Sequence, residues 1–240
     1  MTRNRSLRFA ATVVALAVGA FAPGLQAEET AKAIPFSVAK IIIELNDSAE
    51  DVGIQIFLDT GNPWKWLKGY DPKGRKVLDV STQGSVGTLG VSEFFFESDE
   101  PPLDELPLDE FLHRFPAGKY KFVGQTIDGQ MISSKARLTH AIPEGPEVIT
   151  PQEGSVEDPA NTVIAWHPVA NPPGSSIVGY EVIVEGGNPS QAFDIHVSAA
   201  TTSVTVPAEF LEPGTEYIFE VLAIEAGGNQ TITEGSFTTE

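Results

Sequence analysis

The chain has 240 residues, of which 41% are hydrophobic, with 33 acidic and 15 basic side chains, a formal net charge of −18 and no cysteine. The hydrophobic content predicts at least one buried core, and the negative charge argues against a nucleic-acid or anionic-membrane partner, because both bind cationic surfaces. The lack of cysteine excludes disulfide bonds, thiolate metal sites, a cysteine nucleophile and a lipidated cysteine.

Residues 1–27 have the layout of a secretory signal peptide. Three early arginines precede the uncharged apolar run 10–22, and Ala27 ends a short stretch before the acidic Glu28. The apolar run is too short to span a bilayer comfortably, and no later stretch is long and apolar enough to do so. We therefore predict cleavage after Ala27, export to the periplasm or the medium, and no membrane insertion of the mature chain.

Residues 28–142 alternate apolar and polar side chains in short runs, which predicts an N-terminal β-sandwich domain. The expected strands are residues 40–45, 53–59, 64–70, 76–80, 91–97, 119–126 and 131–140, with one short helix at 108–115. Asp128-Gly129 is a strong hairpin signal between the last two strands. The glycine-rich run 84–90 lies between strands and is not expected to open a helix, which argues against a phosphate-binding loop. The run FPAGKYKF, residues 115–122, resembles the closing hairpin of bacterial Ig-like and transthyretin-like sandwiches.

Asp59 begins an Asp-Thr-Gly tripeptide after an apolar strand. Aspartic proteases use this tripeptide, because two such aspartates share a proton to activate water. The chain holds one copy, so a protease would need a homodimer. The favoured alternative is that Asp59 ends a strand and Gly61-Asn62-Pro63 makes a turn.

Trp64, Trp66 and Tyr70 share one parity, so a flat strand would place all three on one face. Exposed aromatic rings at this spacing can stack on sugar rings, which makes these residues candidates for carbohydrate binding. Buried, the same residues would form half of a sandwich core, and the large apolar area of aromatic side chains favours that interpretation.

Two acidic clusters, residues 46–51 and 97–110, are candidates for calcium binding. Calcium takes six to eight oxygen ligands, and Asn46, Asp47 and Asp51 could converge at the end of a hairpin. No EF-hand spacing is present, so a plain solvated surface is the competing interpretation.

Single polar residues give few further signals. The histidines, His113, His140, His167 and His196, show no helical or short metal-ligand spacing. Asn229 opens the tripeptide NQT, which is a formal glycosylation sequon and would mark a surface turn.

From Pro146 onward the pattern is again one of short alternating strands, and residues 138–240 hold fifteen acidic side chains without a single Lys or Arg. The expected inward-facing residues include Trp166 in one strand and Tyr180 in the next. The run LEPGTEYIFEVLAIEAGGN, residues 211–229, places Leu211, Pro213 and Tyr217 around a corner that leads into a strand. On these residues, the segment of about 143–240 resembles a fibronectin type III domain.

The resemblance implies a seven-stranded sandwich that serves as a spacer or binding module, without catalysis. It implies that Trp166, Tyr180, Leu211, Pro213 and Tyr217 are structural, with the Tyr217 hydroxyl bonded back to upstream backbone. The arginine-dependent receptor contact of some family members does not carry over, because this segment has no arginine.

The sequence thus predicts an all-β protein: a signal peptide at residues 1–27, an Ig-like N-terminal β-sandwich at 28–142 and a fibronectin type III domain at 143–240. We expect a non-catalytic protein that binds or spaces a protein or glycan at the cell envelope. No cofactor is expected, with calcium as an open alternative. Carbohydrate binding through Trp64, Trp66 and Tyr70, and proteolysis through Asp59, are the competing functions.

Overall fold

The computed structural model describes residues 32–240, which fold into fourteen strands and two short helices. This confirms the all-β prediction. The predicted signal peptide lies outside the described residues. Neither helix among residues 32–240 is long and apolar enough to cross a membrane.

The strands of the N-terminal half follow the predicted pattern closely. They are β1 (Val38–Asn46), β2 (Asp51–Tyr70), β3 (Lys76–Ser81), β4 (Val91–Glu97), β5 (Gly118–Thr126) and β6 (Met131–Leu138). The predicted helix is α2 (Leu108–Arg114), which buries Phe111 and carries acidic residues in its first turn and basic residues in its last, as the helix dipole favours. The helix α1 (Gly84–Leu89) was not predicted and corrects the expectation for the glycine-rich run.

Strand β2 covers both of the predicted strands 53–59 and 64–70, and its two parts pair with different strands of the N-terminal half. Its first part, up to Asp59, pairs with β1 and β4, whereas the part from Trp64 to Tyr70 pairs with β3 and β5. The stretch between them is irregular: the pairing with β4 breaks between Asp59 and Trp64, and Gly61 has φ 62°. The predicted turn is therefore a local kink inside one long strand, and the parts of β2 before and after it pair with different strands.

Alternate residues of these strands fill the core of the N-terminal half. Most of its buried members come from β1, β2, β5, β6 and α2, and the largest are Trp64, Tyr120, Phe111 and Phe122. Aromatic side chains bury a large apolar area each, so they dominate the stabilisation of such a core.

The C-terminal half is a sandwich of two sheets. Its strands are β7 (Val148–Thr150), β8 (Ser155–Glu157), β9 (Val163–Trp166), β10 (Ile177–Gly186), β11 (Gln191–Ser198), β12 (Ser203–Thr205), β13 (Glu216–Glu225) and β14 (Gln230–Thr239). One sheet has the order β12-β9-β7 and the other contains β11-β10-β13-β14, with the short β8 beside β14. The core between the sheets holds Trp166, Tyr180, Tyr217, Phe219 and Phe237.

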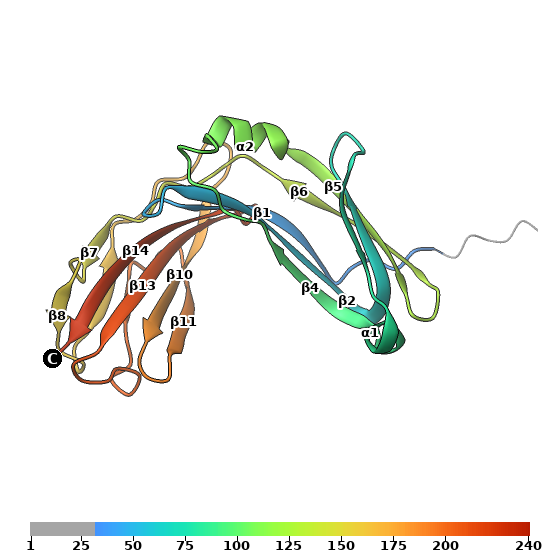
Figure 1. The fold of residues 1–240 in the computed structure, drawn as a ribbon. Coiled ribbons are helices and arrows are strands. Elements are labelled where there is room, and N and C mark those ends of the chain that lie inside the picture. Colours follow the sequence, from blue (N-terminus) through green and yellow to red (C-terminus); the bar gives the residue numbers. More distant parts are fainter. Residues whose placement is uncertain (1–31) are drawn as a thin grey trace, which may run out of the picture. The chain divides into compact units, whose positions relative to one another are not determined.

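A parallel pairing between β1 and β14 joins the sheets of the two halves. Glu44 to Asn46 lie opposite Gln230 to Ile232, so one sheet runs from β11 to β6. Figure 1 shows the red strand β14 meeting the blue strand β1. The predicted division of the chain at residue 142 remains a prediction, and residues 139–147 connect β6 to β7 without regular secondary structure.

Asn229 fixes this junction from the turn before β14. Its side chain is 1% exposed; Oδ1 accepts a hydrogen bond from the backbone N–H of Ile43 at 2.9 Å, and Nδ2 donates to the carbonyl oxygens of Thr139 at 3.1 Å and Ala141 at 3.2 Å. One buried amide therefore ties β1, the connection after β6 and β14 together. The burial corrects the expectation that the sequon at this position marks a surface turn.

Candidate functional site

The pairing of β1 with β14 aligns the outward-facing residues of both halves on one face of the joined sheet. Along β10, for example, Tyr180 and Val182 point into the core while Glu181 and Ile183 point outward, because side chains alternate along a strand. The outward residues of β10, β13, β14, β1 and β2 line a hollow of about 580 Å³, together with Phe95, Glu100 and His196. We call this hollow the sheet groove.

The floor of the sheet groove is apolar. Ile42, Leu222 and Ile232 are 1%, 2% and 8% exposed, yet they belong to neither of the two sandwich cores. Leu222 and Ile232 are direct cross-strand partners on β13 and β14. Because these residues are buried outside the cores, neighbouring side chains of the same face must cover them. The groove therefore has an apolar floor as well as a polar rim.

The rim of the groove is strongly acidic. Glu44, Glu100, Glu181, Glu220 and Glu234 all line it, and the basic side chains there are Lys40 and His196. The Nζ of Lys40 lies 5.7 Å from the centre of the ring of Phe57, which also lines the groove. Carboxylates therefore outnumber the cations that face them.

Two of these carboxyl groups have pKa values well above the ordinary value for glutamate. Burial raises the pKa of Glu220 to about 7, with a further contribution from Glu234, which is its direct partner across the β13–β14 pair. Burial also raises the pKa of Glu100 to about 7, aided by the charges of Glu44 and Asp51. Like charges placed opposite one another are unfavourable, so this surface favours protons or cationic ligands.

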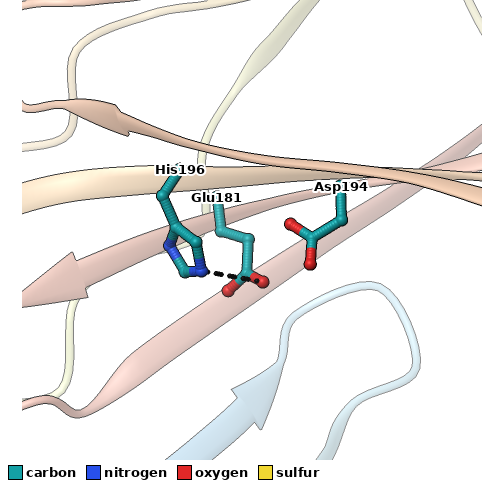
Figure 2. Close-up of side chains that lie close together, drawn as sticks. All are labelled: Glu181, Asp194 and His196. Atoms are coloured by element: carbon teal, nitrogen blue, oxygen red, sulfur yellow. Dashed lines mark ion pairs between the residues drawn. The ribbon is translucent and has the colours of Figure 1, made fainter.

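Two groups of side chains around the groove bring their ligating atoms within 4.8 Å of one another. They are Glu181 with Asp194 and His196, and Glu44 with Glu97 and Glu100. Glu44 and Glu97 both accept hydrogen bonds from the side-chain amide of Gln55, each at 2.8 Å. The first group combines an imidazole with carboxylates and is drawn in Figure 2.

The structure separates the three aromatic residues proposed for carbohydrate binding. Trp64 is 1% exposed and packs edge-on against Phe94, with ring centres 6.3 Å apart. A β-bulge between Trp64 and Trp66 shifts the register against β5, so Trp66 and Tyr70 lie half-buried on the other face. The shared face predicted from parity is therefore wrong, because the prediction assumed a flat strand. Trp66 donates a hydrogen bond to Gln125 at 3.2 Å and carries the Lys68 ammonium over its ring at 5.1 Å.

The residues proposed for calcium binding lie at the hairpin between β1 and β2, where Asn46 and Asp51 are cross-strand partners, and calcium binding there stays a prediction. Asn46 Oδ1 accepts hydrogen bonds from the backbone N–H groups of Ser48 and Ala49 at 3.1 and 3.0 Å, which closes the hairpin between β1 and β2. Neither Asp47 nor Asp51 belongs to the two groups of close ligating side chains within residues 32–240. The oxygen of Asn46 is thus used to shape the turn.

Asp59 likewise serves the local backbone. Its Oδ1 accepts a hydrogen bond from the N–H of Gly61 at 2.7 Å, and it lies opposite Glu93 of β4 on the surface of the sheet. Within the described chain it is in neither group of close ligating residues. The prediction that Asp59 ends a strand is nevertheless wrong, because β2 continues from Asp51 to Tyr70 and Asp59 lies at an irregularity inside it.

The residues proposed as structural lie in and around the C-terminal core. Trp166 and Tyr180 are each 1% exposed and stack edge-on at 5.2 Å, and Leu211 is 6% exposed. Pro213 lies exposed in the turn before β13. The Tyr217 hydroxyl accepts a hydrogen bond from the N–H of Glu212 at 2.7 Å and donates to the carbonyl of Phe210 at 3.4 Å.

Replacing Tyr217 with phenylalanine is expected to lower the free energy of unfolding by about 1 kcal/mol. The ring would keep its packing, while the N–H of Glu212 would lose a part-buried acceptor. Urea unfolding of Tyr217→Phe beside the control Tyr70→Phe measures the difference. A Tyr217→Phe variant as stable as the wild type would show that the corner does not depend on the hydroxyl.

Sequence reasoning missed Glu181, Asp194 and His196 because β11 was not among the predicted strands. A usable signal was present: Asp194 and His196 are two residues apart, which places both on one face once a strand is recognised. The partner Glu181 could not be found in this way, because the register between β10 and β11 is not a property of either strand alone.

The comparison with protein families matches the C-terminal half. Residues 150–239 match the fibronectin type III domain family. No curated protein matches the sequence.

Several solved structures resemble the chain at low sequence identity. The FN1–FN3 domains of chicken CNTN1 share 14% identity over 87% of this chain and 65% of that chain, with a TM-score of 0.34. Two fibronectin type III domains of chicken tenascin share 15% identity over 84% and 99%, with a TM-score of 0.30. A tetra-tandem repeat from the extending region of a large adhesion protein shares 13% over 85% and 50%, with a TM-score of 0.31. The chain thus spans just under two thirds of the CNTN1 fragment. The family match supports the predicted resemblance of residues 150–239 to a fibronectin type III domain.

Proposed function

We propose that the protein is an exported, non-catalytic binding protein of the cell envelope that holds a cationic, partly apolar segment of a partner protein in the sheet groove. The observation that carries this proposal is the groove itself, with an apolar floor of Ile42, Leu222 and Ile232 and five glutamates on its rim. The fibronectin type III match supports a module for contact. The signal-like residues 1–27 motivate export.

Charge complementarity sets the class of the ligand. Burial is the main cause of the raised pKa values of Glu220 and Glu100, and neighbouring carboxylates add to both shifts, so a lysine or arginine side chain would relieve repulsion as well as gain attraction. An apolar side chain beside that cation would cover Leu222 and Ile232. A ligand with a cationic and an apolar side chain would interact favourably with the acidic rim and with the apolar floor. An anionic glycan or nucleic acid would be repelled by the rim.

A fluorescently labelled peptide of alternating lysine and leucine tests the proposal by anisotropy at low and moderate salt. We expect saturable binding to the wild type that weakens about tenfold in the double variant Glu220→Gln, Glu234→Gln, because both carboxylates face the groove from adjacent strands. The matched control is Glu216→Gln, which removes the same charge type from the exposed start of β13. Equal affinity for all three proteins, or no binding to the wild type, would overturn the proposal.

A further inference from the structure

We propose that Glu181, Asp194 and His196 form a binding site for a divalent transition-metal ion, with zinc as the best match. The inference goes beyond the proposed peptide binding, and it stands even if the groove takes no peptide. It rests on the positions of three side chains on two neighbouring strands, which Figure 2 shows hanging from one face of the sheet.

Strand geometry holds the three donors together. Asp194 and His196 project from the same face of β11 because they are two residues apart, and Glu181 is the direct cross-strand partner of His196 on β10. The ligating atoms of all three lie within 4.8 Å of one another, and His196 Nε2 is 3.3 Å from a carboxylate oxygen of Glu181. Donors that share one tetrahedral zinc at about 2.0–2.1 Å are roughly 3.4 Å apart, so small side-chain rotations complete the set.

The donor types select the metal. Calcium and magnesium prefer oxygen ligands, and calcium takes six to eight of them. An imidazole nitrogen beside two carboxylate oxygens suits zinc and its neighbours in the transition series instead. Three protein ligands would leave a fourth position open to water or to a bound partner.

The negative charge around the three side chains also favours a bound cation. Residues 138–240 contain no Lys or Arg, so within this domain His196 is the basic group that faces Glu181 and Asp194. From the neighbouring half, Lys40 contributes at longer range while its ammonium lies over the Phe57 ring. A divalent ion would satisfy both carboxylates at once.

The solvent exposure of the ligand side chains determines how tightly the site is expected to bind zinc. The His196 side chain is 66% exposed and that of Glu181 is 15% exposed, so an ion can enter from the groove without any opening motion. An exposed imidazole orders less well than one held by a second hydrogen bond, and such outer partners raise affinity by about 10–100-fold. We therefore expect micromolar affinity for zinc.

Isothermal titration of the chelator-treated full chain with zinc chloride tests the site. We expect one saturable site in the wild type, at least tenfold weaker binding in His196→Ala and in Asp194→Asn, and at least tenfold weaker binding of calcium than of zinc. His167→Ala is the matched control, because it removes an exposed histidine of the same domain outside the cluster. Circular dichroism of each variant verifies the fold.

Absence of saturable zinc binding by the wild type would overturn the site. So would His196→Ala binding zinc as tightly as His167→Ala does, because the zinc would then lie elsewhere. The peptide assay of the preceding section, repeated with EDTA present, separates the two proposals: peptide binding that persists in EDTA together with no zinc site would refute only the metal inference.

Discussion

Replacing Asn229 with alanine is expected to lower the free energy of unfolding by about 3 kcal/mol and to uncouple the two halves of the chain. The amide is 1% exposed and serves as acceptor for the N–H of Ile43 and as donor to the carbonyls of Thr139 and Ala141. Alanine would leave the buried N–H of Ile43 and the part-buried carbonyls of Thr139 and Ala141 without these partners. Each such orphaned group costs about 1–3 kcal/mol, and the pairing of β1 with β14 beside it would weaken as well.

Differential scanning calorimetry measures both effects. The wild type should unfold in one cooperative transition, whereas Asn229→Ala should show two transitions or one that is clearly broadened. Asn229→Asp should be intermediate, because it keeps the acceptor for Ile43 and loses the donor. Asn161→Ala, at an exposed asparagine of a surface turn, is the control. A single unshifted transition in Asn229→Ala would mean that the junction does not couple the halves.

The same junction explains why the groove exists. The turn before β14 is held by Glu225, which is 1% exposed and accepts hydrogen bonds from the N–H groups of Gly227 at 2.7 Å and Asn229 at 3.0 Å. Thr231 adds a hydrogen bond to the carbonyl of Pro143 at 2.7 Å. These contacts set the register in which Glu44 lies opposite Gln230. The junction therefore decides which outward residues of one half meet those of the other.

Local patterns were sufficient to predict most strands. Alternation identified β1, β3, β4, β5 and β6, and the corner before β13 identified the C-terminal sandwich. These features depend on neighbours along the chain, which is why one sequence reveals them. The pairing of β1 with β14 could not be predicted, because it brings Glu44 beside Gln230 and alternation shows which face of a strand is buried but not which strand lies beside it.

The residues of the candidate site could not be predicted from the sequence for related reasons. The parity argument placed Trp64 and Trp66 on one face, but a bulge lies between them, and a bulge moves every later side chain of the strand to the opposite face. Asn229 looked like a surface sequon because its burial comes from Thr139 and Ile43, which are far away in the chain. The acidic residues of the rim lie far apart in the chain, and only the joined sheet shows that they line one groove.

The burial of two rim carboxyls, with like charges nearby, leads to the second large effect, a loss of stability as the pH rises. Glu100 and Glu220 have pKa values of about 7 in the folded chain, for which burial is the main cause, against an ordinary value of 4.5. The folded state therefore holds these protons more tightly than the unfolded state does, so both carboxyls favour folding below pH 4.5. Their contribution is lost progressively between pH 4.5 and about 7.

The double variant Glu100→Gln, Glu220→Gln is expected to be about 2 kcal/mol more stable than the wild type at pH 8 and nearly equal to it at pH 5. Each shift would correspond to about 3 kcal/mol, reduced here to about 1 kcal/mol because both side chains are partly solvated. Urea unfolding of both proteins at the two pH values measures this difference. Glu216→Gln, at an exposed position on β13, controls for the general gain from removing negative charge. A double variant that retains the pH dependence of the wild type would show that these carboxyls do not bear the repulsion, and the cationic ligand proposed for the groove would then lose its electrostatic basis.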